Sequence, residues 1–489
     1  MSAMSTTSRH MLHAAWSALE LPEDALGAVH FGGAGDLPSY FATTDLAAAS
    51  VAAAGLAMRE LIEALGGDAA QVAVDRRLAS LWFGWSIHPV GWERPPLWDA
   101  VAGDYATADG WIRLHTNASH HRDAALAVLA CPADRDAVAR AVAGWGGVAL
   151  EEAVVQQGGC AAAMRSMAAW AEHPQGRAVA AEPLIAIGAM PASASRSWAG
   201  TPTRPLTGLK VLDLTRVLAG PVATRFLAGY GADVLRLDPP SWNEPGVIPE
   251  VALGKRCARL DLALPAHRAI FERLLAEADV LVHGYRPAAL EHLGYGEQFR
   301  RRLNPGLIDV SLDAYGWTGP LAGRRGFDSL VQMSCGIAEH GMRAQGAGKP
   351  VPLPVQALDH ATGYLMAAAT VRGLLYRLTE GRAMQARLSL ARTAKLLTDA
   401  SSSDGARADG AAASWGRAPA MEAATGADLA PQLEQTEWGP ARRYHPPLAI
   451  DGAPMAWDRR RPALARPPRA GAPGAARIEP RVGEKIRRK

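Results

Sequence analysis

Apolar and polar positions in the second half of the chain follow the pattern of alternating strands and helices. The short apolar runs that have the length of buried strands fall at 210–214, 232–237, 280–282 and 307–312. Helix-like segments lie between them, the clearest at about 265–278 and 287–293. This alternation predicts an α/β fold with a doubly wound, mostly parallel sheet.

A long apolar helix is predicted at 360–379, and a strand that passes into another helix is predicted at 386–397. Asp359 stands where the preceding loop becomes the long helix, just ahead of a run of alanines. A carboxylate at a helix N-terminus can cap the free N–H groups of the first turn. The position of Asp359 is therefore compatible with a structural cap as well as with a chemical role.

The first 200 residues are organised differently. Residues 104–115 alternate as a β-hairpin does, with Asp109 and Gly110 at the turn, and helical stretches follow. A segment rich in Pro, Ser and Ala then separates this part from the second half. We predict a smaller α+β domain at 100–190, a linker at 191–205 and the large domain at 206–400.

One segment of the chain has an internal counterpart. The sequence from Thr43 onward resembles residues 358–397, because both contain an Asp, an Ala-rich helix, a turn, a strand and a second helix. The similarity predicts that residues 1–99, a largely helical segment, carry a second copy of the Asp359 element around Asp45. Ala-rich helices can also match by composition alone, so chance similarity stays open.

Composition narrows the class of protein. The chain has 489 residues, and 49% of them are hydrophobic, which is enough for more than one compact core. Basic and acidic residues nearly cancel to a net charge of +3, so no nucleic-acid partner is indicated. Residues 401–427 have the composition of a flexible linker, and residues 459–489 that of a disordered basic tail.

Cysteine spacing and hydropathy favour a cytoplasmic protein. The four cysteines lie far apart without a CxxC pair, which is typical of reduced thiols. The N-terminus lacks the apolar core of a secretory signal, and charges interrupt the Ala-rich stretches before they could span a bilayer, so no membrane association is expected. The doublet His120-His121 has no further ligand at a suitable spacing, so no metal site is predicted.

Sequence motifs narrow the function further. No GxGxxG, GxSxG, HExxH or GxxxxGK[ST] pattern supports a dinucleotide, hydrolase, zinc-protease or P-loop site. Five other stretches resemble, in the same order, the class III CoA-transferase (CaiB/BaiF-like) family, which includes formyl-CoA transferases, carnitine CoA-transferases and α-methylacyl-CoA racemases. They are "PLTGLKVLDLTRVLAGPVATRFLAGYGADVLRLDPP", "GKRCARLDL", "YRPAALEHLGY", "LNPGLIDVSLDAYGWTGPLAGRRGFDSLVQMSCGI" and "ALDHATGYLMAAAT".

The resemblance also indicates a changed domain order. "GDYATADGWIRL" and "GGCAAAMRSMAAWAEHPQGRAVA" are similar to the family's small domain, which normally follows the large domain but here precedes it. Residues 428–458 resemble the family's returning C-terminal segment. The chain therefore resembles a rearranged or partly duplicated member. Because members form interlocked dimers, the resemblance implies a homodimer, whose assembly the altered order could change.

The resemblance implies a role for Asp359 as nucleophile. In this family the acid at that position attacks a thioester to give a mixed anhydride, and the CoA thiolate then forms an aspartyl-CoA thioester. The implied partners are an acyl-CoA and a small carboxylic acid, with the CoA thioester as substrate and no permanently bound cofactor. Burial would raise the pKa of Asp359, and the helix N-terminus would lower it. The backbone N–H groups at the start of the helix could also face a developing oxyanion.

The family motifs also imply residues that bind CoA, through cations and open N–H groups for its phosphates. They are Leu218, Ala219, Lys255, Arg256, Leu260, Asp261, Leu262, Ala263, Gly284, Tyr285, Arg286 and His292. His292 stands where several relatives have Arg, so one phosphate contact is expected to be weaker. Each basic residue could instead be an ordinary surface charge.

Two other functions stay open. Racemisation of a 2-methylacyl-CoA needs two bases, and racemase relatives carry a His where this chain has Phe327, which cannot transfer a proton. His340 and His360 are possible substitutes, although His360 directly follows Asp359 and a structural role is favoured. An inactive CoA-binding or scaffolding protein is the third interpretation, and the intact "ALDHATG" argues against it.

Asp45 could be a second nucleophile, a relic or a helix cap. We favour a relic, because "TTDLAAAS" lacks the glycine that follows Asp359 at Gly363.

Overall fold

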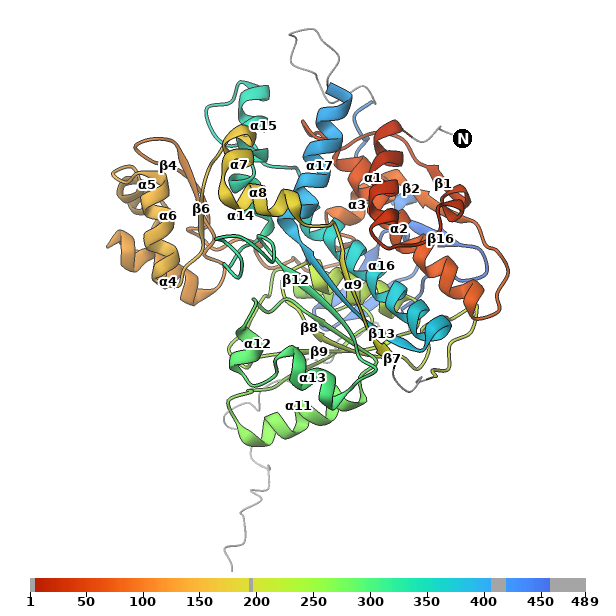
Figure 1. The fold of residues 1–489 in the computed structure, drawn as a ribbon. Helices are drawn as coiled ribbons and strands as arrows, with labels where there is room; N and C mark the ends of the chain where they lie inside the picture. The colour runs from red at the N-terminus through yellow and green to blue at the C-terminus, as the bar shows by residue number, and fades with distance from the viewer. Residues whose placement is uncertain (1–4, 193–196, 406–418, 458–489) are drawn as a thin grey trace, which may run out of the picture.

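A seven-stranded sheet forms the centre of the molecule in the computed structural model, which describes residues 5–192, 197–405 and 419–457 (Figure 1). In spatial order its strands are β10 (Arg256–Arg259), β9 (Asp233–Asp238), β8 (Lys210–Leu214), β11 (Val280–His283), β12 (Ile308–Asp313), β13 (Arg382–Ser389) and β7 (Ala186–Ala192). Neighbouring strands are parallel except β7, which pairs antiparallel with β13. The predicted doubly wound, mostly parallel α/β sheet is confirmed.

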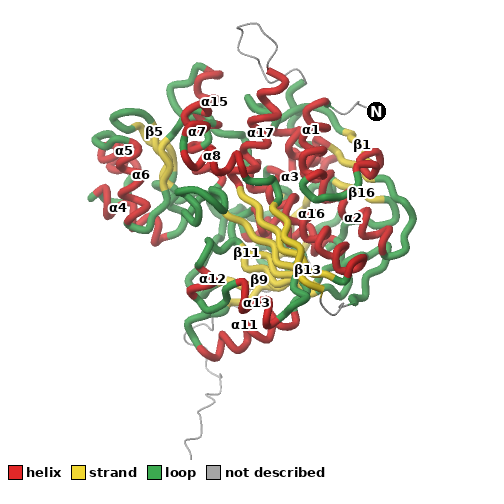
Figure 2. Tube along the Cα trace, in the orientation of Figure 1, coloured by secondary structure: helices red, strands yellow, loops and turns green. Residues whose placement is uncertain are grey.

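Helices cover both faces of this sheet (Figure 2). Successive side chains of a strand point to opposite faces, and β11 shows the division. Val280 and Val282 join the core formed with α9 (Ala219–Gly229) and α16 (Ala357–Glu380), whereas Leu281 joins the core around Phe271. On this second face lie α11 (Pro265–Glu277), α12 (Ala289–His292) and α13 (Glu297–Leu303). The short helix α10 (Ile248–Val251) precedes β10.

The long helix predicted at 360–379 is present, but it begins earlier, at Ala357, so Asp359 lies inside its first turn. Gly363 lets α9 approach this turn closely, because a Cβ there would lie 2.4 Å from the carbonyl oxygen of Ala219. The predicted strand and helix after it are β13 and α17 (Leu390–Gly405). Between β12 and α16 lie α14 (Asp328–Ser334) and α15 (Ile337–Gln345).

A separate lobe is built around a three-stranded antiparallel sheet (Figure 1). Its strands are β4 (Gly103–Ala106), β5 (Trp111–Leu114) and β6 (Ala161–Ala163), and its helices are α4 (Ser119–Leu129), α5 (Arg135–Val142) and α6 (Gly147–Gln156). β4 and β5 form the predicted hairpin, in which the amide of Thr107 donates to the carbonyl of Gly110. From this lobe α7 (Met167–Glu172) and α8 (Pro174–Ala181) lead to β7.

The two ends of the described chain meet. The N-terminal part contains α1 (Thr6–Ser17), the 3-10 helix η1 (Glu23–Ala28), β1 (Val29–Gly32), α2 (Thr43–Ala64), β2 (Val72–Asp75), α3 (Arg76–Phe83) and β3 (Ile87–Pro89). The C-terminal part adds η2 (Gly426–Asp428), β14 (Glu434–Thr436), β15 (Gly439–Arg443) and β16 (Leu448–Ile450). β15 pairs with β3 and β16 pairs with β2, so residues 434–450 complete two small sheets of the N-terminal part.

The Ala-rich helices α2 and α16 pack against each other beside the main sheet (Figure 1). Alanines such as Ala52 and Ala368 are fully buried, and their small side chains allow the two backbones to approach. The order α2, β2, α3 repeats the order α16, β13, α17, and Asp45 and Asp359 each lie in a first turn. Asp45 therefore occupies the corresponding place in its helix.

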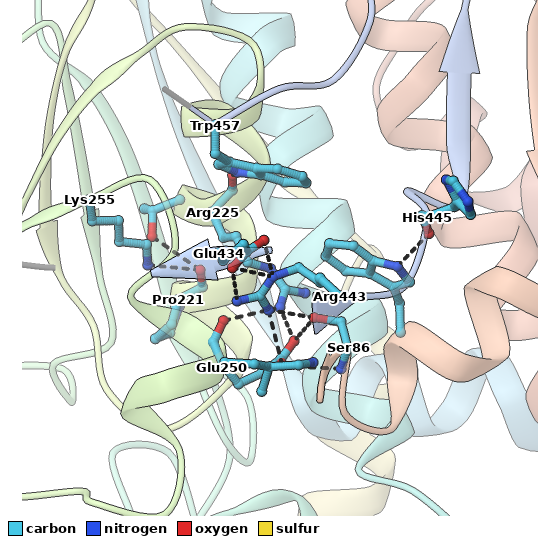
Figure 3. Close-up of polar contacts among 12 residues, drawn as sticks. Ser86, Pro221, Arg225, Glu250, Lys255, Glu434, Arg443, His445 and Trp457 are labelled. Atoms are coloured by element: carbon cyan, nitrogen blue, oxygen red, sulfur yellow. Dashed lines mark hydrogen bonds and ion pairs between the residues drawn. The ribbon is translucent and has the colours of Figure 1, made fainter. Parts of the chain in front are cut away.

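A buried ionic cluster joins three distant segments (Figure 3). The guanidinium of Arg443 contacts Glu434 at 3.1 Å, the hydroxyl of Ser86 at 2.7 Å and the carboxylate of Glu250 at 3.4 Å. Glu250 also accepts from the hydroxyl of Ser86 and pairs with Arg225. The pKa of Glu250 is lowered to about 2, because the nearby arginines outweigh the opposing effect of burial. The cluster holds β15 against α9 and α10.

The flexible linker predicted at 401–427 is only partly described by the structure. Residues 401–405 continue α17, where Ala400 and Ser401 are buried, so the flexible linker predicted at 401–427 does not begin at 401. Met421 donates its amide to the carbonyl of Asp36. Residues 406–418 and the predicted basic tail lie outside the described residues. Within the described residues, every helix is too short or too polar to cross a bilayer.

Candidate active site

Asp359 lies on the wall of a cavity of about 390 Å³ at the carboxyl ends of β8, β11 and β12. Its side chain is nearly buried, with 6% of the residue exposed. Thr215, Gly284 and Asp313 mark the ends of the three strands on the cavity wall. Open parallel sheets bind ligands at this edge, because the loops that follow adjacent strands diverge there.

The cavity wall is strongly cationic. Arg216, Arg286, Arg324 and Arg325 all line it. In the described part of the chain, the hydrogen bonds of Arg216, Arg286 and Arg325 go to neutral oxygens, namely the hydroxyl of Tyr285 and the carbonyls of Gly323 and Gly158. Arg324 instead pairs with Glu151 at 2.7 Å. Three guanidinium charges without a carboxylate partner make this cavity suited to a polyanion.

The turn after β8 lines the cationic cavity together with Asp359. Val217 has a φ of 63°, a conformation that is strained for a β-branched residue. Its amide donates to the carboxylate of Glu244 at 2.6 Å, which helps to hold the turn. Arg216 stacks on the rings of Trp242 and Tyr285. The strained turn therefore places Arg216 in the cationic cavity while α9 begins immediately after it.

A second buried carboxylate supports Asp359. Oδ2 of Asp328 accepts hydrogen bonds from the amides of Leu358 at 2.9 Å and Asp359 at 3.1 Å, so Asp328 caps α16. Burial raises the pKa of Asp359 well above its usual range, and the charge of Asp328 raises it further. Burial also raises the pKa of Asp328 to about 6. Of the two opposing effects considered for Asp359, burial dominates.

A smaller cavity adjoins Asp359, and a second one continues from it. One, of about 40 Å³, is lined by Asp359 together with Trp98, His115 and Phe327. The other, of about 200 Å³, shares Trp98, His115 and Phe327 with it. His115 stacks on Phe327, with ring centroids 3.6 Å apart and planes 5° apart. Asp359 thus lines both a cationic cavity and a largely aromatic one.

The structure brings some of the predicted CoA-binding residues to this site. Ala219, Gly284, Tyr285 and Arg286 line the cationic cavity with Asp359, and Leu218 lines the 40 Å³ cavity. They come from the turn before α9 and from the loop after β11. Residues that the family motifs singled out in these two loops therefore lie beside Asp359, and their contacts with CoA stay predictions.

Lys255 lies elsewhere. Its ammonium group is fully buried and donates to the carboxylate of Asp213 at 3.1 Å and to the carbonyl of Pro221 at 2.9 Å; Figure 3 shows the Pro221 contact. Burial lowers the pKa of Lys255 to about 8 although Asp213 opposes the shift. A lysine in this position cannot reach a phosphate in solvent. The prediction that Lys255 contacts a CoA phosphate is therefore corrected: this lysine stabilises the core beside α9.

The remaining predicted contacts are not on the walls of these cavities. Arg256 lies on the outer strand β10, where its exposed side chain pairs with Asp233 at 2.7 Å. Leu260, Asp261, Leu262 and Ala263 follow that strand, and Oδ1 of Asp261 accepts from the amide of Ala263. His292 ends α12. The CoA contacts of these residues stay predictions.

Sequence reasoning missed several residues of the site. Arg216 directly follows a predicted strand, and Arg324 and Arg325 directly precede Phe327, which are positions where a site residue could have been sought. Asp328 lies in the same "RRGFDSL" motif. His115 carried no local signal, because it comes from the hairpin of the small lobe, far from Asp359 in sequence.

The other histidines considered have different surroundings. His360 is buried and stacks on Phe83, and burial lowers its pKa to about 3. His340 packs against Phe41. His121 lines the cationic cavity, and burial lowers its pKa to about 4. His360 and His340 are absent from the cavity walls around Asp359 in the described part of the chain.

Asp45 has a different environment from Asp359. Oδ1 of Asp45 accepts hydrogen bonds from the hydroxyls of Ser5, at 2.6 Å, and of Ser8, and pairs with Arg76 at 3.0 Å. Where α16 has Gly363, α2 has Ala49. Asp45 is thus a carboxylate that stabilises the contact between α1, α2 and α3.

Comparison with known proteins agrees with the motif analysis. Residues 206–424 match the sequence model described as CoA-transferase family III. The acetyl-coenzyme A transferase nodX of Hypoxylon pulicicidum is 35% identical over 39% of this chain and 33% of its own length. The succinyl-CoA:glutarate CoA-transferase of Mus musculus is 33% identical over 38% of this chain and 47% of its own length.

Among solved structures, the crystal structure of Rv3272 from Mycobacterium tuberculosis is 34% identical, with a TM-score of 0.36, over 39% of this chain and 54% of that one. The chain spans about half or less of the length of these curated relatives. Residues 206–424 are therefore similar to CoA-transferase family III, the family that the sequence motifs resemble.

Proposed function

We propose that this chain transfers CoA from an acyl-CoA to a carboxylic acid, with Asp359 as the nucleophile. The observation that supports this most is the position of Asp359, a nearly buried carboxylate on the wall shared by a cationic and an aromatic cavity. A CoA thioester has the matching halves, because its phosphates lie at one end and its acyl group at the other. Asp359 would face the thioester between them.

The reaction would proceed through two covalent states. A carboxylate oxygen of Asp359 attacks the thioester carbonyl, the C–S bond breaks, and CoA leaves as a thiolate with a mixed anhydride on Asp359. The thiolate then attacks the carbonyl carbon of Asp359 and releases the first acid as a carboxylate. A second carboxylate reverses these steps and leaves as the new acyl-CoA, so no net proton is consumed.

The surroundings of Asp359 suit this chemistry. Burial excludes water, which would hydrolyse an anhydride, and leaves the carboxylate poorly solvated and therefore more reactive. The amides of Leu358 and Asp359 are already bound by Asp328, so they are not available to steady an oxyanion. We assign the CoA phosphates to Arg216, Arg286 and Arg325, whose charges lack a carboxylate partner among the described residues.

The test is peptide mass mapping after incubation with a panel of acyl-CoAs and hydroxylamine. Hydroxylamine converts an activated aspartyl carbonyl into a stable hydroxamate, and we expect this mass shift on the peptide that contains Asp359. Asp359→Ala should abolish the shift, and Asp45→Ala is the matched control that should keep it. A shift on the Asp45 peptide instead, or on neither peptide in protein that binds CoA, would contradict the proposal.

One observation favours a second candidate, racemisation of a 2-methylacyl-CoA. His115 lies against Phe327, the position at which racemase relatives carry a histidine, and His115 and Asp359 both line the 40 Å³ cavity. Two proton-transfer groups at one cavity are what such a reaction needs. Exchange of the substrate α-proton into deuterated water, without an acceptor acid, would support racemisation, whereas its absence would support transfer.

The homodimer and the cytoplasmic location remain proposals from the resemblance and the composition. Light scattering of the purified protein tests the first. We expect the mass of two chains, and the mass of a single chain would contradict the homodimer.

A further inference from the structure

The cavities around Asp359 form a continuous series. Asp359, Val217 and Phe327 line both the cationic cavity and the 40 Å³ cavity. The 40 Å³ cavity in turn shares Leu97, Trp98 and His115 with the 200 Å³ cavity. We name the two smaller cavities together the acyl chamber. If the CoA phosphates lie among the arginines, the group beyond the thioester carbonyl enters this chamber.

The walls of the acyl chamber are mainly apolar and aromatic. Trp85, Leu97, Trp98, Val217, Val247 and Phe327 are among its lining residues. In the part of the chain that the structure describes, no lysine or arginine is on these walls. An apolar substituent would gain free energy by leaving water here, whereas a charged one would lose its hydration without compensation.

The charged groups on the chamber walls are acids. Asp99 accepts from Arg122 and from the hydroxyl of Thr116, and Glu244 accepts from Arg236 and from the amide of Val217. Each acid is therefore paired with an arginine and with one neutral donor. Paired in this way, the acids leave no free cation, among the described residues of these walls, that could neutralise a second carboxylate.

Three arginines lie over rings of the chamber without being among its lining residues: Arg94 over Trp85, Arg113 over Trp98 and Arg216 over Trp242. Arg216 lines the cationic cavity, where it is assigned to the CoA phosphates. Arg113 lies over the ring of Trp98, 4.8 Å from its centroid, but its guanidinium pairs with Asp104 at 2.7 Å. Arg113 is also outside the set of residues that line the chamber. Its charge is therefore offset before it reaches the ligand.

The chamber offers uncharged hydrogen-bonding groups instead. His115 is nearly buried, and its Nδ1 has no hydrogen-bond partner among the described residues. Burial and the nearby Arg113 keep the pKa of His115 well below its ordinary value, so the ring is neutral. Nε1 of Trp242, on the wall of the 200 Å³ cavity, also lacks a partner in the described chain. Such groups can orient a carbonyl or hydroxyl but cannot neutralise a carboxylate.

We infer that the acyl group of the CoA thioester derives from a monocarboxylic acid whose chain is uncharged and either branched or aromatic. Acyl groups of dicarboxylic acids, which carry a second carboxylate, are excluded from the acyl chamber. The inference rests on the proposed function for the identity of the ligand as a CoA thioester. The apolar and aromatic walls, and the lack of lysine or arginine among their described lining residues, carry it.

The test uses two unreactive thioethers of CoA that differ only at the end of the acyl mimic. S-(4-methylpentyl)-CoA ends in an isopropyl group, and S-(3-carboxypropyl)-CoA ends in a carboxylate of similar shape. Titration calorimetry on the full chain should give at least about tenfold tighter binding of the methylpentyl compound, a difference of about 1.4 kcal/mol. Equal binding, or tighter binding of the carboxypropyl compound, would overturn the inference.

A positive charge introduced into the acyl chamber tests whether the acyl group binds there. Val247→Arg places a cation on the wall of both smaller cavities and should move the preference toward the carboxypropyl compound by about tenfold. Val148→Arg, on the exposed surface of the small lobe, is the matched control and should leave the preference unchanged. Leu97→Arg serves as a second variant if Val247→Arg does not fold, with binding of free CoA as the check on folding. An unchanged preference in a folded variant would show that the acyl group binds elsewhere.

These binding measurements do not depend on catalysis. If no acyl-CoA labels Asp359 with hydroxylamine, the transfer mechanism fails while the thioether preference can still be measured. If Asp359 is labelled and the carboxypropyl compound binds more tightly, only the inference about the acyl group fails.

Discussion

Asp328 accepts a hydrogen bond from the amide of Asp359 at 3.1 Å, and the two buried carboxylates therefore share one site. Asp328 stabilises the first turn of α16 through its contacts with the backbone of Asp359 and Leu358. At the same time, its charge raises the pKa of Asp359 beyond the effect of burial. One residue thus fixes the position of the proposed nucleophile and influences its protonation.

Asp328→Asn should shift the pH profile of Asp359 modification to lower pH. The nucleophile must be ionised, so the rate of hydroxamate formation should rise with pH through the raised pKa of Asp359. Asn can still accept from the backbone amides but carries no charge, and the midpoint should fall while burial keeps it above the ordinary value of 3.8. The exposed variant Asp399→Asn is the control. A midpoint that does not move would show that Asp328 acts only as a cap.

Asp359→Asn should stabilise the folded protein at neutral pH. Because the folded-state pKa is raised, the stability linked to this proton is fully present below 3.8 and is lost as pH rises through the folded-state pKa. The variant lacks that loss, so its Tm should exceed that of the original chain at neutral pH, and the difference should vanish near pH 3.8. Thermal unfolding followed by circular dichroism across this range measures it. A lower Tm at neutral pH would indicate that ionised Asp359 is a net stabilising group.

Arg216→Ala and Arg286→Ala should each weaken CoA binding, by about 1–3 kcal/mol if the guanidinium contacts a phosphate. The loss should shrink as salt concentration rises, because screening weakens the interaction in the original chain as well. Titration calorimetry with free CoA at two salt concentrations measures both effects. Arg256→Ala, which removes an exposed arginine outside the cavity, is the matched control. Equal losses of CoA-binding free energy in all three variants would mean that CoA does not bind in the cationic cavity.

Arg443→Ala should strongly destabilise the protein. Removing Arg443 leaves the buried carboxylate of Glu434 without its cationic partner, at a cost of about 3–5 kcal/mol, while Glu250 keeps its pair with Arg225. Urea unfolding measures the change. Arg343→Ala removes an exposed arginine that pairs with Glu339 on the same helix, and its effect should stay within about 1 kcal/mol. Similar losses from both variants would show that the cluster does not anchor β15.

Asp45→Asn should leave hydroxamate formation at Asp359 unchanged and lower stability moderately. Oδ1 of Asp45 holds Ser5, Ser8 and Arg76, so the loss of its charge weakens charge-assisted bonds worth about 1–3 kcal/mol in total. Mass mapping and thermal unfolding of the same preparation separate the two effects. Loss of Asp359 labelling in a folded variant would assign Asp45 a role in the chemistry.

Much of the fold and part of the site could be predicted from local sequence. The strands around Val211 and Val310 are short apolar runs, and the turn at Asp109 and Gly110 has its own chemistry, so each is determined largely by neighbouring residues. The place of Asp359 at the start of a long helix, and the similarity to CoA-transferase family III, followed from short motifs for the same reason.

Only the tertiary structure decided which polar residues meet. Lys255 and Arg256 are adjacent, yet the first is buried against Asp213 and the second is exposed, because Lys255 precedes β10 and Arg256 begins that strand at the edge of the sheet. His115 reaches the site from a separate lobe. The sequence by itself determined the elements and the nucleophile candidate, since these depend on near neighbours. The charge of the cavity, the neutral state of His115 and the raised pKa of Asp359 depend on contacts between distant segments, which folding alone creates.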